Sequence, residues 1–143
     1  MAHMRSQIRD AAHAALETGL SATVKRSRVY SVESATNIAY SISTAGVERV
    51  TQRTSTEVLR QCPVTVDMHA GGASDTLDDT LDDKCVLVEQ TLSYNKLGGL
   101  VRSLHLETTE IELDGTGETA KGIARLTFMA LYGTSRTDPE TAA

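Results

Sequence analysis

Aromatic residues are scarce in this sequence, which contains one Phe, four Tyr and no Trp. Proteins that hold single-stranded nucleic acid usually stack the bases on aromatic side chains, so the scarcity argues against such a surface. The net charge is −5 at neutral pH, and this also disfavours nonspecific DNA binding, which depends on neutralising phosphates. The sequence therefore does not predict a nucleic-acid-binding protein.

Long apolar runs are also missing. No stretch of about 18 apolar residues could span a membrane, and no secretory signal opens the chain. We therefore expect a soluble protein, made inside the cell and without a membrane partner. The two cysteines, Cys62 and Cys85, are far apart and form no CxxC pair. We interpret them as buried free thiols, with a disulfide as the alternative.

The length of 143 residues is enough for one hydrophobic core and too short for two. We therefore expect a single domain over residues 4–136. Residues 1–3 read as a remnant of an expression vector, with Met4 as the natural start. Residues 137–143 are polar, and we expect them to form a frayed tail.

Familiar catalytic motifs are absent as well. The sequence has no HExxH, no Cys/His set with zinc spacing and no glycine-rich phosphate loop. It therefore predicts no catalytic residues, no metal site and no cofactor. His69 is interpreted as a polar residue on the solvated face of a strand.

One stretch, "SDTLDDTLDDKCVLVEQTL" at residues 74–92, could still hold a metal, because five aspartates crowd its first half. An EF-hand loop needs glycine at its sixth position and ligands at alternate positions, and this stretch has neither. The alternative is a small metal-dependent enzyme that uses His69 with this cluster. The cluster consists of Asp75, Asp78, Asp79, Asp82 and Asp83.

A helix explains the same stretch better. At about 100° per residue, five apolar positions share one face: Leu77, Leu81, Cys85, Val88 and Leu92. We predict an amphipathic helix that is capped by Ser74 and ends before two glycines. Its solvent face would carry Asp75, Asp78, Asp79 and Asp82.

The remaining chain predicts a second helix and several strands. Residues 4–18 form one apolar helical face and lead to Gly19, a stop signal. The strand at residues 62–68 points Cys62, Val64, Val66 and Met68 to one side, and Pro63 suggests that this strand lies at a sheet edge or is bulged there. Residues 104–113 change phase, which predicts a bulge, and residues 123–132 are apolar on both faces, which predicts a central strand. The fold class is therefore α+β: a mixed, mostly antiparallel sheet with two main helices packed against it.

A polar arm at residues 47–57 interrupts the strands. It reads as the far part of a long hairpin or as a loop, and such segments often carry contacts. We expect Arg49, Gln52, Arg53 and Glu57 to form an interface with a neighbouring subunit or partner. The strand that is apolar on both faces, together with an alanine-lined first helix, likewise favours contact between copies of the chain.

Four segments in order resemble the tail terminator proteins of bacteriophages, the lambda-like tail completion family. These segments are the opening helix "MRSQIRDAAHAALE", the strand "CPVTVDMHA", the acidic helix "SDTLDDTLDDKCVLVEQTL" and the ending "LHLETTEIELDGTGETAKGIARLTFMALYGTS". The resemblance covers nearly the whole chain, although no single motif in it is diagnostic.

The resemblance implies a structural virion protein that forms a ring, typically of six subunits. Such a ring caps the tail tube, ends its polymerisation and forms the tail side of the head–tail joint. Its partners would be copies of itself, the tail tube protein and the head–tail connector protein. DNA would pass through the lumen without specific binding, which suits an acidic subunit. The protein would reside in the virion tail or neck, and in the host cytoplasm during assembly. The alternative within this class is a head-completion or neck connector protein.

Overall fold

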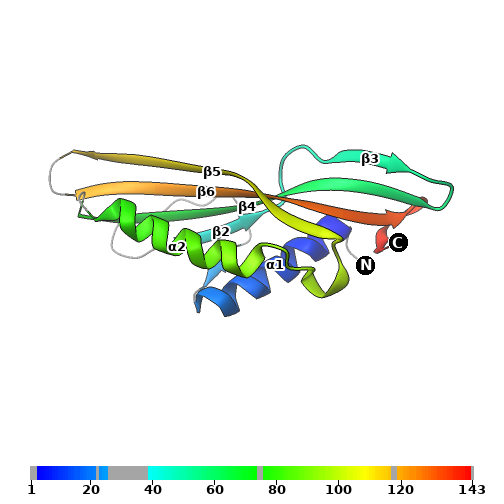
Figure 1. Ribbon diagram of the computed structural model, residues 1–143, viewed down its shortest axis with the longest axis horizontal. Helices are drawn as coiled ribbons and strands as arrows, with labels where there is room; N and C mark the ends of the chain where they lie inside the picture. The colour runs from blue at the N-terminus through cyan, green and yellow to red at the C-terminus, as the bar shows by residue number, and fades with distance from the viewer. Residues whose placement is uncertain (1–2, 22, 26–38, 74–75, 117–118, 143) are drawn as a thin grey trace.

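The computed structural model describes residues 3–21, 23–25, 39–73, 76–116 and 119–142. The described chain is elongated, with its strands running along the long axis and both α-helices on one side of the sheet (Figure 1). The helices are α1 (Met4–Leu20), α2 (Leu77–Leu92) and the short 3₁₀ helix η1 (Leu97–Gly99). The strands are β1 (Val24–Lys25), β2 (Ala39–Ser43), β3 (Arg49–Arg53), β4 (Glu57–Ala73), β5 (Ser103–Thr116), β6 (Thr119–Ser135) and β7 (Asp138–Ala142).

The seven strands form one mixed sheet that curls into a half-barrel. Its main order is β1-β2-β4-β6-β5, while β3 pairs with β4 and β7 pairs with β6. Only the β1–β2 pair is parallel among the described pairs. The predicted α+β class, with a mostly antiparallel sheet and two packed helices, is confirmed. Within the described residues, no helix is both long and apolar enough to cross a membrane.

Helix α2 buries the predicted face against the sheet, and Asp78, Asp79 and Asp82 are exposed, as predicted. The buried residues are Leu77, Leu81, Cys85, Val88 and Leu92. The helix starts later than predicted, because its N-cap is Thr76, which makes no side-chain capping bond. Ser74 and Asp75 lie outside the described residues. Asp78 and Asp79 occupy the first turn, where the positive end of the helix dipole favours negative charge.

Helix α1 also forms where predicted and buries Ile8, Ala12 and Leu16. It does not stop at Gly19 but continues to Leu20, and Ser21 then takes a left-handed conformation with φ of 51°. A Cβ at Gly19 would lie 2.4 Å from the Thr91 Oγ1 atom of α2. Gly19 therefore serves the close approach of the two helices rather than the end of α1.

The core lies between these helices and the centre of the sheet. Strand β4 contributes the predicted apolar face of Cys62, Val64, Val66 and Met68. Strand β6 contributes large side chains such as Phe128 and Tyr132, which are fully buried. Strand β6 pairs with β4 on one side and β5 on the other, which confirms the predicted central strand. The predicted bulge is present too, as a register shift between Leu106 and Thr108.

The prediction that Pro63 marks a sheet edge or a bulge is wrong, because the register of β4 with β6 runs through Pro63 without a shift. Strand β4 has β6 along one side and both β2 and β3 along the other. The β2 pairing stops at Thr65 and the β3 pairing starts at Gln61, so Pro63 falls where one partner strand is replaced by the next. A proline, which has no backbone N–H to donate, is accommodated at this junction inside the sheet.

The polar C-terminal segment also differs from the frayed tail that was expected. Residues Asp138–Ala142 form β7, which returns alongside β6. The Asp138 carboxylate accepts hydrogen bonds from the Glu140 backbone N–H at 2.9 Å and from the Thr141 hydroxyl at 2.6 Å. The Gln7 side chain of α1 donates to the Glu140 carbonyl at 2.9 Å. These local bonds order a segment whose composition alone suggested disorder.

Candidate interaction surfaces

The arm, defined as residues 47–57, forms the far part of a hairpin, which is one of the two forms predicted for it. All five residues of β3 are exposed, and the strand pairs only with the first part of β4 among the described residues. The turn is closed by the Thr54 N–H, which donates to the Glu57 carbonyl at 2.9 Å. The arm projects from one end of the long axis, away from the N-terminus of α2 (Figure 1).

The four predicted interface residues fall into two groups. Arg49, Gln52 and Arg53 are exposed along β3. Glu57 is half-buried and forms an ion pair with Arg102. A Cβ at Gly133 would lie 2.5 Å from the Glu57 Oε1 atom, so the glycine leaves room for this pair. Three of the four residues therefore face outward, while Glu57 anchors the arm to its own chain.

Glu48, which the sequence analysis missed, forms the root of the arm. Its carboxylate accepts from the Arg5 Nη1 atom at 2.6 Å and the Arg60 Nη1 atom at 3.4 Å. It also accepts a hydrogen bond from the buried Tyr132 hydroxyl. Burial and this hydrogen bond raise the pKa of Tyr132, so the phenol stays protonated and donates. No local pattern could reveal these contacts, because the partners are distant in sequence and lie in α1, β4 and β6.

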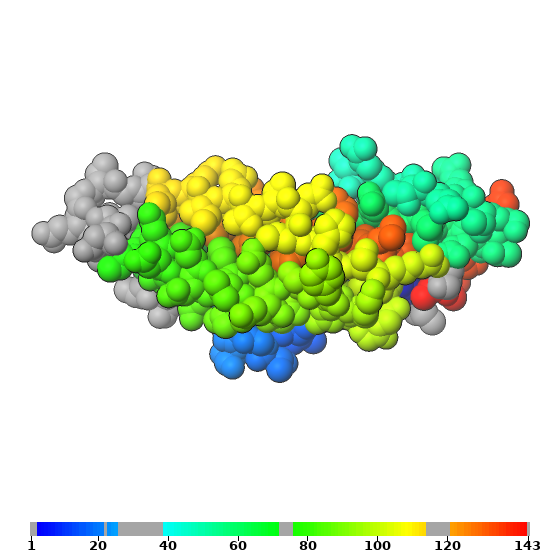
Figure 2. Space-filling model, in the orientation of Figure 1, coloured from blue at the N-terminus to red at the C-terminus, as the bar shows by residue number. Residues whose placement is uncertain are grey.

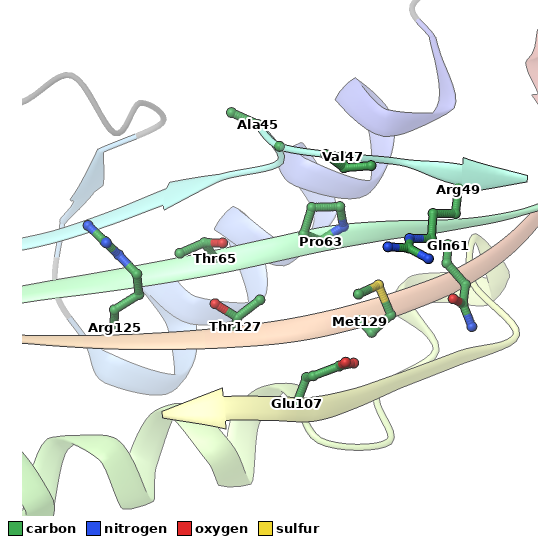
Figure 3. Close-up of a pocket in the computed structure, with 11 residues that line it drawn as sticks. Ala45, Val47, Arg49, Gln61, Pro63, Thr65, Glu107, Arg125, Thr127 and Met129 are labelled. Carbon is green, nitrogen blue, oxygen red and sulfur yellow. The ribbon is translucent and has the colours of Figure 1, made fainter. Parts of the chain in front are cut away.

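A hollow of about 610 Å³ lies beside the arm, on the face of the sheet opposite the helices (Figure 3). Arg125 sits at one end of it and Arg49 and Gln61 at the other, as Figure 3 shows. Arg125 is held by the buried Asp67 carboxylate, with an Nε to Oδ1 distance of 2.8 Å. The lining is Ala45, Gly46, Val47, Arg49, Gln61, Pro63, Thr65, Glu107, Arg125, Thr127 and Met129. This lining contains no His or Cys, and its charged side chains are Arg49, Glu107 and Arg125.

His69 and the acidic helix lie apart. His69 lies on the helix-free face of the sheet, in a small open hollow with Glu112, Lys121 and Ile123. Helix α2, with Asp78, covers the other face, so the structure does not bring His69 and Asp78 together. Asp75 lies outside the described residues. Within the described part of the chain, no group of three or more His, Cys, Asp or Glu side chains could hold a metal.

Both cysteines are free thiols in buried positions, which confirms the first of the two sequence interpretations. Burial raises the pKa of the Cys62 thiol to about 12 and that of Cys85 to about 11. The thiolate is the reactive form of cysteine. Both side chains are therefore core residues with low reactivity.

No protein-family model matches this chain, and no curated protein is detectably similar to it in sequence. Its fold is similar to that of a chain in the solved structure "Virion of native gene transfer agent (GTA) particle". The two share 15% sequence identity with a TM-score of 0.53, and the likeness covers 90% of each chain. The likeness concerns the fold over nearly the full length of both chains.

Proposed function

We propose that this protein is a structural subunit of a phage-like virion. One observation carries the proposal: the fold matches a chain of a gene transfer agent virion over 90% of both chains, with no large segment left over. The division of the molecule into a packed body and a projecting polar arm supports the same role. A subunit that works by contact needs a rigid body and an outward surface. The packed core supplies the body, and the arm, which Glu48 fixes to it, supplies the surface.

Within the virion, the role proposed is that of the tail terminator. A ring of these subunits, six in number, caps the tail tube, stops its growth and presents a surface to the head–tail connector protein. The six-fold number comes from the resemblance to tail terminators in sequence order. The exposed residues Arg49, Gln52 and Arg53 would contact a neighbouring subunit or the last ring of tail tube protein. DNA would pass through the lumen without being bound.

The test is to assemble particles without this protein and to image them by electron microscopy. Loss of a terminator leaves the tube free to polymerise, so the expected result is overlong tails that are not joined to heads. Supplying the protein in trans should restore tails of uniform length.

The alternative within the virion, a neck connector or head-completion protein, gives a different image. Tails of normal length beside DNA-filled heads would contradict the terminator role and support the connector role. Particles that assemble normally without the protein would contradict both.

A further inference from the structure

Among the strands with an edge that no other described strand covers, β3 and β5 carry exposed charged and apolar side chains together. Strand β3 pairs only with β4, and strand β5 pairs only with β6, in the described part of the chain. The two edges lie at opposite ends of the elongated molecule (Figure 1). An open strand edge exposes backbone N–H and C=O groups that can pair with another strand.

The edge of β3 is basic and carries apolar side chains. Arg49 and Arg53 are exposed, while Val50 is 45% and the preceding Val47 74% exposed. Arg49 pairs in register with Gln61 and therefore lies on the helix-free face of the sheet. Val50 and Arg53, opposite Arg60 and Val58, lie on the helix side.

The edge of β5 has the opposite charge and apolar side chains in corresponding places. Glu110 and Glu112 are exposed on the helix-free face, opposite Arg125 and Ile123 of β6. Ile111 and Leu113 lie on the helix side and remain 40% and 48% exposed.

Helix α2 adds carboxylates to the helix side of the β5 edge. Thr91 of α2 faces α1, where a Cβ at Gly19 would touch it. Asp82 precedes Thr91 by nine residues, or half a turn around the helix, and so points away from α1 toward β5. Figure 2 shows α2 and β5 side by side along the surface, with the arm at the other end.

We infer that the β3 edge of one copy of this chain docks on the β5 edge of the next copy. Continuing the sheet in this way places Arg49 near Glu110 and Glu112 on one face. On the other face it places Val50 over Ile111 and Leu113, and Arg53 near Asp82. A second copy of the chain is therefore the occupant that charge and apolar surface favour on both edges.

This contact joins two different surfaces, so it is head-to-tail and adds subunits in one direction until a ring closes. The inference rests on the proposed function, because the closed ring is the assembly that such a contact would build. It also gives the acidic helix a role beyond folding: Asp82 would complete the receiving surface.

The test is cross-linking with a short bis-maleimide between single-cysteine variants, since the native thiols are buried. Val50→Cys mixed with Ile111→Cys should give a covalent dimer and nothing larger. One chain carrying both substitutions should give a ladder that ends at the ring number. Val50→Cys mixed with Leu87→Cys is the matched control and should give no product. Leu87 is comparably exposed at 36%, but it lies about 140° around α2 from Asp82, on the side that faces away from β5.

Charge reversal supplies the second readout. Arg49→Glu with Arg53→Glu, or Glu110→Lys with Glu112→Lys, should each lower the cross-linked fraction about tenfold, and combining the two sets should restore it. Asp82→Lys should weaken the product, whereas Asp83→Lys, on the other side of the same helix, should not. Raising the salt concentration should lower the yield, because exposed charges are screened.

The outcomes separate this inference from the proposed function. A Val50→Cys product with itself would indicate a two-fold contact and overturn the inference. Rings that form, and tails that are capped, without any Val50–Ile111 product would overturn this interface alone. Overlong tails that the wild-type protein never shortens would overturn the terminator role, whatever the cross-linking shows.

Discussion

Strands β4 and β6 pass through two different environments, and the contrast between them separates folding from contact. Where they run beneath the helices, the side chains facing α1 and α2 are fully buried, among them Val64, Val66, Leu126 and Phe128. At the arm, β4 pairs with β3, in which every side chain is exposed. The same long strands thus support a core at one end and an outward surface at the other.

The junction between the two regions is polar and specific. Glu48 ties the start of the arm to α1 through Arg5, to β4 through Arg60 and to β6 through Tyr132. Its side chain is only 12% exposed. The arm is therefore fixed relative to the body, as a contact surface must be if binding is not to carry a large ordering cost.

The largest effect is expected in the packed region. Leu81→Asp places a charge without a partner between α2 and the sheet, where Leu81 is fully buried. We expect a loss of more than about 4 kcal/mol in the free energy of unfolding, measured by chemical denaturation. A variant that melts within a few degrees of the wild type would show that α2 does not pack as described.

A smaller effect is expected at the junction. Glu48→Gln removes the charge that Arg5 and Arg60 share, and it leaves the half-buried Arg60 guanidinium poorly compensated. We expect a loss of about 2 kcal/mol in the free energy of unfolding. Glu107→Gln, an exposed carboxylate, is the control and should change stability by less than about 0.5 kcal/mol. Equal effects of the two changes would show that Glu48 does not stabilise the junction between the arm and the body.

Trimming the arm should affect function far more than folding. Replacing residues 51–59 with Asn-Gly joins Val50 and Arg60, which already lie opposite each other, through a two-residue hairpin. We expect a loss of about 1 kcal/mol in stability, because Val58 is buried and would be lost. Circular dichroism should show a folded protein, and tail capping should be abolished. A trimmed protein that still caps tails would contradict the role of the arm.

The smallest effect on folding is expected from the acidic face of α2. Changing Asp78, Asp79 and Asp82 together to Asn should leave the protein folded, since each exposed side chain contributes within about 0.5 kcal/mol. Thermal melting is sufficient to measure this. If the triple variant unfolds while Leu81→Asp does not, the orientation assigned to α2 is wrong.

Periodicity in the sequence predicted the packed region well. The apolar face of α2, the core face of β4, the bulge in β5 and the central position of β6 all follow from side-chain alternation and apolar content. These elements bury a continuous face, so their pattern carries the information.

The arm and the segments around its junction with the body were harder to predict, because their contacts join distant parts of the sequence. Pro63 suggested an edge, since a sequence does not show that two partner strands meet end to end there. The sequence did not single out Glu48, because its partners Arg5 and Tyr132 are 43 and 84 residues away. The strand at residues 138–142 was missed because hydrogen bonds, rather than apolar burial, order it.

The proposed role requires copies of this chain to form a ring at the end of a tail tube. The most direct measurement is the mass by light scattering at low and high protein concentration, followed by imaging of tails with the protein added. We predict a monomer, or a mass that rises with concentration toward a closed ring, and density of that ring at tail ends. A compact two-fold dimer that persists at every concentration, with no density at tail ends, would contradict the account.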